Sequence, residues 1–207
     1  MPGDQEPRIP STPLLAAAAE TLRQLGPRRF SLTAVAETAG VSRGTVHNIL
    51  GTRDAAITAA LDHLSAGFIA TLAAEISEHD TLAEQAAAAA VLISAHRRRS
   101  ASTPRGINQS VLILLLEHGN EELIRRSGEL WMPLVRAAKQ RGEVAAEVDT
   151  GLASEWIMRV LFSFELLPPI RVNLDSPRSV RRFVCDHIIA GLGGASRDTQ
   201  QVKEIPA

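Results

Sequence analysis

Tyrosine does not occur among the 207 residues of the chain, and cysteine occurs once, as Cys185. A lone cysteine excludes an internal disulfide and fits a reducing compartment. The longest apolar runs, residues 86–93 and 111–116, fall well short of the ~20 residues that a membrane span needs. The first ten residues lack the basic and then apolar order of a signal peptide. We therefore expect a cytoplasmic protein that does not enter a membrane.

Catalytic signatures are missing as well. The chain has no HExxH sequence, no paired cysteines, no phosphate-cradling glycine loop and no GxSxG turn. Its six histidines do not fall at the spacing of metal ligands. The sequence thus predicts a protein that is not an enzyme and that needs no cofactor or metal. One alternative stays open: an enzyme built on a helical body, whose single perturbed carboxylate or histidine leaves no signature.

Strand patterns are also scarce. No window shows a sustained alternation of Val, Ile, Thr and aromatic residues, so strands are not expected. Much of the apolar fraction is Ala and Leu, and these residues favour helix. The predicted fold class is all-α, in a chain long enough for one large or two small domains.

The charge of the chain is small but unevenly distributed. The formal net charge is −1, whereas residues 8–53 contain six arginines and two glutamates. A basic N-terminal region on a nearly neutral body is typical of a DNA-reading head on a regulatory body. An ordinary solvated surface explains the charges alone equally well.

Residues 31–50, SLTAVAETAGVSRGTVHNIL, carry the most specific pattern in the sequence. The first half has apolar residues at helical spacing and ends at Gly40, since glycine suits the left-handed conformation that ends many helices. Val41 is expected to act as an apolar plug between two helices. Ser42 is expected to cap a second helix that begins at Arg43. Two short helices joined in this way form a helix-turn-helix.

The second of these helices has two faces. Its inward-facing residues are expected to be Val46, Ile49 and Leu50. Its outer face consists of small and hydrogen-bonding groups that suit insertion into a DNA major groove; they are Arg43, Gly44, Thr45, His47 and Asn48.

The same stretch resembles the N-terminal domain of the TetR family of bacterial transcriptional repressors. The resemblance covers roughly residues 12–64 and rests on the run TAVAETAGVSRGTVHNILGTRDAAITAAL, with its AGVS turn and the following Gly-Thr pair. It implies a three-helix DNA-binding domain and a larger helical domain for ligand binding and dimerisation. Family members carry aromatic residues where this chain has His47, Ile49 and Leu50. The phosphate contact that a tyrosine hydroxyl makes in the family therefore either passes to His47 or has no counterpart here.

The predicted DNA contacts are of two kinds. Base edges are assigned to Thr45, His47 and Asn48, of which asparagine is well suited to adenine. Phosphates are assigned to Ser42, Arg43 and Arg53. The full predicted set is Ser42, Arg43, Gly44, Thr45, His47, Asn48, Arg53 and Thr33.

The chain divides into four segments. Residues 1–11, with three prolines, are expected to form a flexible arm. Residues 12–52 form the predicted DNA-binding domain, whose first helix begins at Thr12-Pro13 and ends before Gly26-Pro27. Residues 53–193 form the predicted regulatory and dimerisation domain, which opens with a connecting helix over 53–78 capped by Thr52. Residues 194–207 are polar and are expected to be disordered.

Two apolar segments near the end, 149–167 and 176–192, are predicted to pack as an antiparallel helix pair. A pair this apolar needs a partner surface, and in the resembled family the corresponding pair docks on its symmetry mate as a four-helix bundle. The predicted interface residues are Leu152, Trp156, Val160, Phe164, Val180, Phe183, Val184, His187 and Ile188.

The helical body is apolar enough to enclose a pocket for a small hydrophobic ligand. The predicted lining residues are Trp131, Asn108, Gln109, His118 and Trp156. Core packing explains the two tryptophans just as well.

These features together predict a ligand-responsive, sequence-specific DNA-binding transcriptional regulator. In the resembled family such a protein is a repressor that binds a palindromic operator as a homodimer, so double-stranded DNA, a second copy and a small hydrophobic effector are the expected partners. The alternative is a helical small-molecule-binding protein whose helix-turn-helix serves only packing. Negligible, salt-independent DNA binding would favour that alternative.

Overall fold

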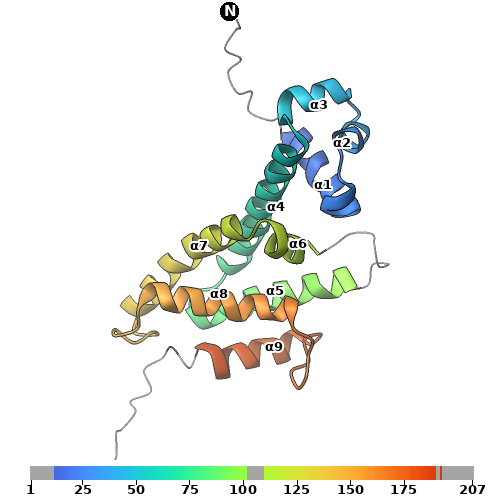
Figure 1. Cartoon of the computed structure of the whole chain (residues 1–207). Coiled ribbons are helices and arrows are strands. Elements are labelled where there is room, and N and C mark those ends of the chain that lie inside the picture. Colours follow the sequence, from blue (N-terminus) through green and yellow to red (C-terminus); the bar gives the residue numbers. More distant parts are fainter. Residues whose placement is uncertain (1–11, 102–109, 190–191, 193–207) are drawn as a thin grey trace, which may run out of the picture.

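The computed structural model describes residues 12–101, 110–189 and 192. Within these ranges every regular element is a helix, which confirms the predicted all-α class. Figure 1 shows a head of three helices, joined by one long helix to a larger helical body.

The helices follow one another without interruption by other regular structure in the described ranges. The head consists of α1 (Thr12–Arg29), α2 (Leu32–Ala39) and α3 (Arg43–Leu50), and α4 (Arg53–Ile76) leads out of it. The body continues with α5 (Leu82–Ala101), α6 (Val111–His118), α7 (Asn120–Gln140), α8 (Thr150–Leu166), α9 (Pro177–Phe183) and the π-helical segment η1 (Val184–Ile189).

The first helix differs from its prediction at the C-terminal end. It was predicted to end before Gly26, but it resumes beyond a kink there and continues to Arg29. Gly26 has a φ of +69°, a conformation that glycine adopts without steric cost. Pro27 then lies in the first turn of the resumed helix, where its missing N–H is not needed. The sequence shows the break but not the helical turn that follows it.

The long helix α4 joins the head to the body. Thr52 caps it by accepting a hydrogen bond from the Ala55 N–H (3.2 Å), which confirms the predicted cap. In the described part of the chain it is the one helix that is long and apolar enough to cross a membrane by length and composition. It packs instead against α1 in the head and against α5, α6 and α7 in the body. It is therefore a core helix shared by the two parts.

Helix α5 lies at the centre of the body. Its residues 86–90 are all alanine and are all buried. Such small side chains let neighbouring helices approach closely. α8 packs on α5, and so do α9 and η1, while α7 packs on both α8 and α4. The buried residues of head and body form one continuous cluster.

Helices α8 and α9 do not form the predicted close pair. α9 packs on α5 and α8 packs on both α5 and α7, rather than on each other. Between them lies an edge-to-face contact of Phe164 and Phe183, whose ring centroids are 6.1 Å apart. The apolar side chains of α9 thus mainly cover α5, and those of α8 cover both α5 and α7.

Candidate nucleic-acid interface

Helix α3 presents a polar face at the end of the head farthest from the body (Figure 1). Val46 and Leu50 are buried in the head and Ile49 is half-buried, as predicted. The exposed residues are Ser42, Arg43, Gly44, Thr45, His47 and Asn48. The fold therefore brings every predicted contact residue of this helix to one solvent-facing surface. Thr33, in the first turn of α2, and Arg53, at the start of α4, are exposed as well.

The turn before α3 has the predicted glycine but not the predicted plug. Gly40 is in the left-handed conformation (φ +66°), and the Val41 N–H donates to the Ala36 carbonyl oxygen (3.0 Å). Val41 itself is 41% exposed, so the prediction that it fills the space between α2 and α3 is wrong. The backbone bond that closes the end of α2 already fixes the turn, and the side chain is left facing solvent.

Ser42 caps α3 as predicted. Its Oγ accepts a hydrogen bond from the Thr45 N–H (3.0 Å) and lies 2.9 Å from the Thr45 hydroxyl. A Cβ added at Gly44 would meet only the Ser42 Oγ, at 3.6 Å, which is an ordinary contact. The fold does not require glycine at position 44, but glycine leaves the backbone of the first turn open to close approach by a partner.

Arg53 faces the backbone of the head. Its Nε donates to the Phe30 carbonyl oxygen (3.0 Å), one terminal nitrogen donates to the Pro27 carbonyl oxygen, and the other pairs with Asp54 (3.2 Å). All three guanidinium nitrogens are therefore engaged within the head. This arrangement ties the start of α4 to the last turn of α1 and to the connection between α1 and α2, and favours a positioning role over the predicted phosphate contact.

The predicted dimer residues divide into an exposed and a buried set. The exposed or half-buried residues are Leu152 (69% exposed), Trp156 (47%), Val160, Phe183 and His187. The buried residues, at most 4% exposed, are Phe164, Val180 and Val184. For these three the prediction is corrected, because their side chains fill the core of the chain and offer no surface to a partner. The Ile188 side chain lies outside the described residues.

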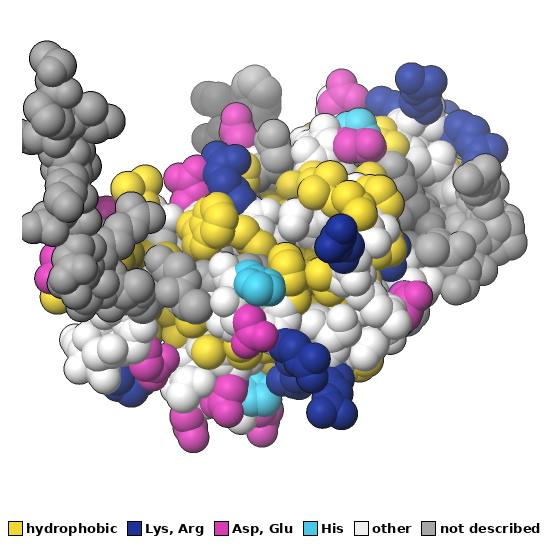
Figure 2. Space-filling view, turned by 90° about the horizontal axis from the view of Figure 1, so that it is seen from below, with side chains coloured by type: hydrophobic (Ala, Val, Ile, Leu, Met, Phe, Trp, Pro, Cys, Tyr) yellow, Lys and Arg dark blue, Asp and Glu magenta, His cyan; other side chains and the backbone are white. Residues whose placement is uncertain are grey.

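The underside of the body, below α8 and α9 in Figure 1, combines apolar and charged groups. Figure 2 shows apolar side chains gathered in patches there, with basic, acidic and histidine side chains between them. This face therefore offers both apolar area and charged groups to a partner.

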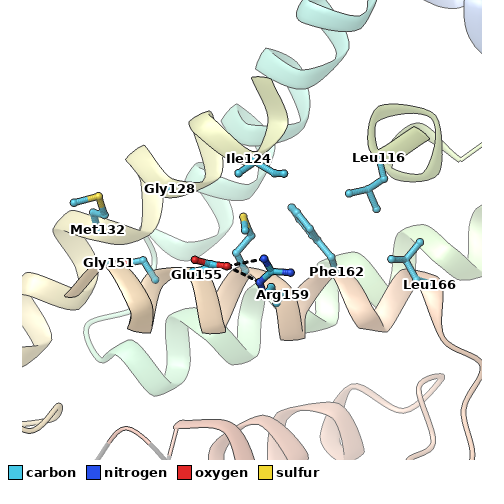
Figure 3. Close-up of a pocket in the computed structure, with 11 residues that line it drawn as sticks. Leu116, Ile124, Gly128, Met132, Gly151, Glu155, Arg159, Phe162 and Leu166 are labelled. Atoms are coloured by element: carbon cyan, nitrogen blue, oxygen red, sulfur yellow. Dashed lines mark hydrogen bonds and ion pairs between the residues drawn. The ribbon is translucent and has the colours of Figure 1, made fainter. Parts of the chain in front are cut away.

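The cavities between helices of the body include two of small-molecule volume. One, of about 350 Å³, is open to solvent between α4, α5 and α6 and is lined in part by His63, Gly67, Phe68 and His96. The other, of about 460 Å³, is a groove between α7 and α8 (Figure 3). A pocket in the body was predicted but its lining residues were not, because each cavity is the space left between helices that are distant along the chain.

The predicted ligand-lining residues lie elsewhere. Trp131 is 1% exposed and belongs to the core, so the core-packing explanation holds for it. Trp156 lies on the surface of α8, and His118 borders a third cavity where α4 meets α6 and α7. Asn108 and Gln109 lie outside the described residues.

Glu165 is a buried acid that the sequence predictions missed. It is 6% exposed, and its Oε1 accepts a hydrogen bond from the Ser110 hydroxyl (2.5 Å). Its Oε2 is buried and accepts no hydrogen bond from the described residues. Burial raises the pKa of this carboxyl, while the Ser110 hydrogen bond and the charge of Arg97 oppose the rise. The signal in the sequence was an acid within the apolar run of residues 160–167.

No family model and no curated protein matches the chain. Solved structures do match its fold. A TetR-family regulator from Cytophaga hutchinsonii is 17% identical with a TM-score of 0.64, over 87% of this chain and 93% of its own. The TetR-family repressor AlkX from Dietzia, implicated in biodegradation of n-alkanes, is 24% identical with a TM-score of 0.55, over 92% and 97%.

A third match is the transcriptional regulator FadR from Bacillus subtilis, solved in complex with stearoyl-CoA. It is 19% identical with a TM-score of 0.59, over 85% of this chain and 98% of its own. All three proteins are transcriptional regulators, and each match spans head and body together. The chain therefore has the fold of the TetR family of transcriptional regulators.

Proposed function

We propose that this protein is a sequence-specific DNA-binding regulator of transcription. The observation that carries the proposal is the exposed polar face of α3, held on a three-helix head whose own core is filled by the opposite face. Residues 12–52 read DNA, and residues 53–193 bind the effector and the second copy. The transcriptional regulators with the same fold support this division.

Each exposed side chain of α3 has a proposed role. Thr45, His47 and Asn48 face base edges in the major groove. Arg43 and the Ser42 hydroxyl contact phosphates, and the open backbone at Gly44 lets the helix approach closely. Arg53 is assigned to positioning, since its guanidinium already binds the head.

The protein acts as a homodimer on a palindromic operator. Leu152 and Trp156 expose large apolar surfaces on α8, and burial of such surfaces favours association. A two-fold axis between two bodies would present two α3 helices to successive major grooves. The cell compartment is the cytoplasm, where DNA is accessible.

The effector is a small hydrophobic molecule, and its binding releases the protein from DNA, as for a repressor. Two cavities in the body have the volume of small-molecule sites. FadR, of the same fold, was solved with stearoyl-CoA, which supports a ligand that has a long apolar chain. The effector acts only through its different affinity for DNA-competent and DNA-incompetent states.

Fluorescence anisotropy with the protein's own upstream DNA, at two salt concentrations and against a scrambled duplex, tests the proposal. Specific binding that weakens steeply with salt is expected. Equal, weak and salt-insensitive binding to both duplexes would favour a helical ligand-binding protein that does not read DNA.

Asn48→Ala extends this test to base reading. The variant should lose discrimination at one operator position by about 1–3 kcal/mol while binding scrambled DNA as before. Equal losses on matched and scrambled DNA would remove Asn48 from the base-reading residues.

A further inference from the structure

We propose that the groove between α7 and α8 binds an uncharged, unbranched hydrocarbon chain with one hydrogen-bonding end, such as a long-chain alcohol. Only the identification of this molecule as the effector rests on the proposed function. The binding itself follows from the shape and chemistry of the groove.

The groove has a buried floor and exposed apolar walls. Its floor is formed by Ser154, Met158 and Phe162 of α8, which are 3%, 7% and 7% exposed. Its walls carry Ile124 and Met132 of α7 and Leu166 of α8, which are 45%, 39% and 52% exposed. Large apolar side chains exposed around a concave surface are typical of a ligand site. The two methionines can adapt to a chain of variable shape.

The groove is also long and narrow. Gly151 and Leu166 lie at its two ends on α8 (Figure 3), about 22 Å apart along the helix axis. Its volume of about 460 Å³ is within the range of small-molecule sites. Space of this length between two helices suits an extended hydrocarbon chain. Midway along the α7 wall, no heavy atom lies within 4 Å of the place where a Cβ on Gly128 would be.

The two charged residues that line the groove have opposite charges and pair with each other. The Arg159 Nε and one terminal nitrogen approach the Glu155 Oε1 at 2.7 and 2.6 Å (Figure 3). The pair leaves the lining with no net charge, so a charged ligand gains no unpaired partner. The second carboxylate oxygen and the remaining guanidinium nitrogen can accept from and donate to a single hydroxyl.

The groove is separate from the proposed dimer surface. The groove lining does not include Leu152 and Trp156, which are the exposed large apolar residues in the first half of α8. A ligand and a second copy can therefore occupy α8 together.

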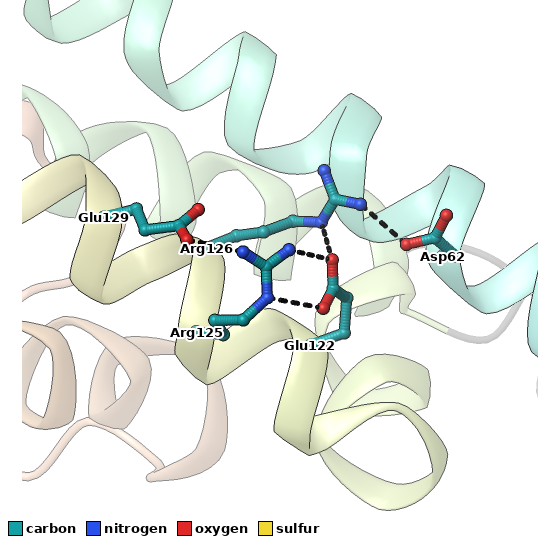
Figure 4. A network of polar contacts seen from close by, with 5 residues as sticks. All are labelled: Asp62, Glu122, Arg125, Arg126 and Glu129. Atoms are coloured by element: carbon teal, nitrogen blue, oxygen red, sulfur yellow. Dashed lines mark hydrogen bonds and ion pairs between the residues drawn. The ribbon is translucent and has the colours of Figure 1, made fainter.

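Helix α7 connects the groove with α4. Ile124, Gly128 and Met132 recur every four residues and form the groove wall. Another face of the helix carries Arg126, which pairs with Asp62 of α4 at 2.6 Å (Figure 4). A hydrocarbon chain bound between α7 and α8 thus contacts the helix that is ion-paired with α4.

Calorimetric titration of the full chain with 1-octanol and 1-decanol tests the proposal. Saturable binding with a negative heat-capacity change is expected, because apolar surface is buried. The Kd should tighten about fourfold for each added methylene. Decanoate and decyltrimethylammonium should bind no tighter than 1-decanol, because the lining is neutral.

Two glycine variants locate the site. Gly128→Leu fills the groove and should weaken 1-decanol binding at least tenfold, while leucine favours the helix. Gly67→Leu places the same side chain into the cavity of α4, α5 and α6, at another helical glycine with no heavy atom within 4 Å. It should leave the Kd for 1-decanol unchanged.

Unchanged binding in Gly128→Leu, or loss of binding in Gly67→Leu alone, would overturn the proposal. A charged analogue that binds tenfold more tightly than 1-decanol would do the same. If Gly128→Leu does not fold, Ile124→Glu places a carboxylate on the exposed wall and should weaken binding similarly. These titrations contain no DNA, so a failure of the groove and a failure of DNA reading are distinguished.

Discussion

At the scale of single residues, Arg53 allows two roles of an arginine in DNA binding to be distinguished: contact with a phosphate, and positioning of the head that reads DNA. Its guanidinium holds the backbone of the head, so we expect Arg53→Gln to lower the free energy of unfolding by about 1 kcal/mol, or ~2–4 °C in Tm. Affinity for the operator should fall with it, while the slope of log affinity against log salt should not change.

Arg43→Gln is the matched control for this prediction. Arg43 is exposed on α3, and loss of a phosphate contact should reduce the salt slope by about 0.9 and leave Tm unchanged. Anisotropy titrations over several salt concentrations, with thermal melts of both variants, make the comparison. A reduced slope for Arg53→Gln would restore it to the phosphate contacts.

Glu165 gives a prediction on pH. Because burial raises its pKa in the folded state, the folded chain holds this proton more tightly than the unfolded chain does. The resulting cost is absent below the unfolded pKa, grows as pH rises through the folded pKa, and is complete above it. We expect Glu165→Gln to raise Tm by ~2–4 °C at pH 8, equivalent to about 1 kcal/mol. The gain should shrink toward pH 4.

Thermal melts of the Glu165→Gln variant and the parent across this pH range provide the measurement. The glutamine oxygen can still accept the Ser110 hydrogen bond, so the packing is preserved. A lower Tm for the variant at pH 8 would mean that attraction to Arg97 outweighs the burial of the carboxylate.

These residues also show what the sequence could and could not predict. The caps at Ser42 and Thr52 were predictable because a cap depends on residues three positions apart. The hydrogen bond from Ser110 to Glu165 joins residues 55 positions apart, and it depends on how α6 meets α8. No local pattern encodes such a meeting.

At the scale of helices, α4 and α7 are joined by a network of charges (Figure 4). Arg125 and Arg126 both pair with Glu122, and Arg125 also pairs with Glu129. Hydrogen bonds from Arg125, helped by the charge of Arg126, lower the pKa of Glu122 to about 2. The stabilisation from this ionised carboxylate is complete above its unfolded pKa and is lost only as pH falls toward 2. The network is therefore fully charged at neutral pH.

The pair of Asp62 and Arg126 gives a prediction on coupling. Asp62→Asn removes the ion pair between α4 and α7 but should change the free energy of unfolding by less than about 1 kcal/mol, since the pair is solvent-exposed. The loss of DNA affinity caused by 1-decanol should become smaller, because α4 no longer follows α7. Anisotropy titrations with and without 1-decanol measure the difference.

Glu129→Gln is the control for the coupling prediction. It removes an ion pair within α7 that does not reach α4. This variant should respond to 1-decanol like the parent. The same response in Asp62→Asn would show that the ion pair does not transmit the signal.

Helix contacts show a further limit of sequence prediction. The apolar spacing along α8 and α9 identified both as helices with buried faces. Spacing does not state which surface covers a face, and the alanine-rich α5 accepts both helices side by side. Phe164, Val180 and Val184 were therefore assigned to the wrong neighbour.

At the scale of the whole molecule, the proposed dimer gives the clearest prediction. Trp156→Glu places a charge on the exposed apolar surface of α8, and two-fold symmetry repeats it in the interface. We expect dimerisation to weaken at least tenfold and operator affinity to fall, because one head reaches only one half-site. Analytical ultracentrifugation measures the oligomeric state.

Ile124→Glu is the control for the dimer prediction. It adds the same charge to another exposed apolar position, in the groove wall, and should leave the dimer intact. A dimer that is unaffected by Trp156→Glu but dissociated by Ile124→Glu would place the interface across α7 instead.

Because α4 packs in both the head and the body, it limits where this chain can be cut to make a chimaera with another protein. Ala56 and Ala60 of α4 are fully buried close to the head, and Leu72 and Ile76 are buried in the body. A chimaera cut at residue 52 would graft three helices without the one that covers them. A functional transplant of the DNA-reading specificity must carry the first turns of α4 with it, and the junction belongs inside that helix.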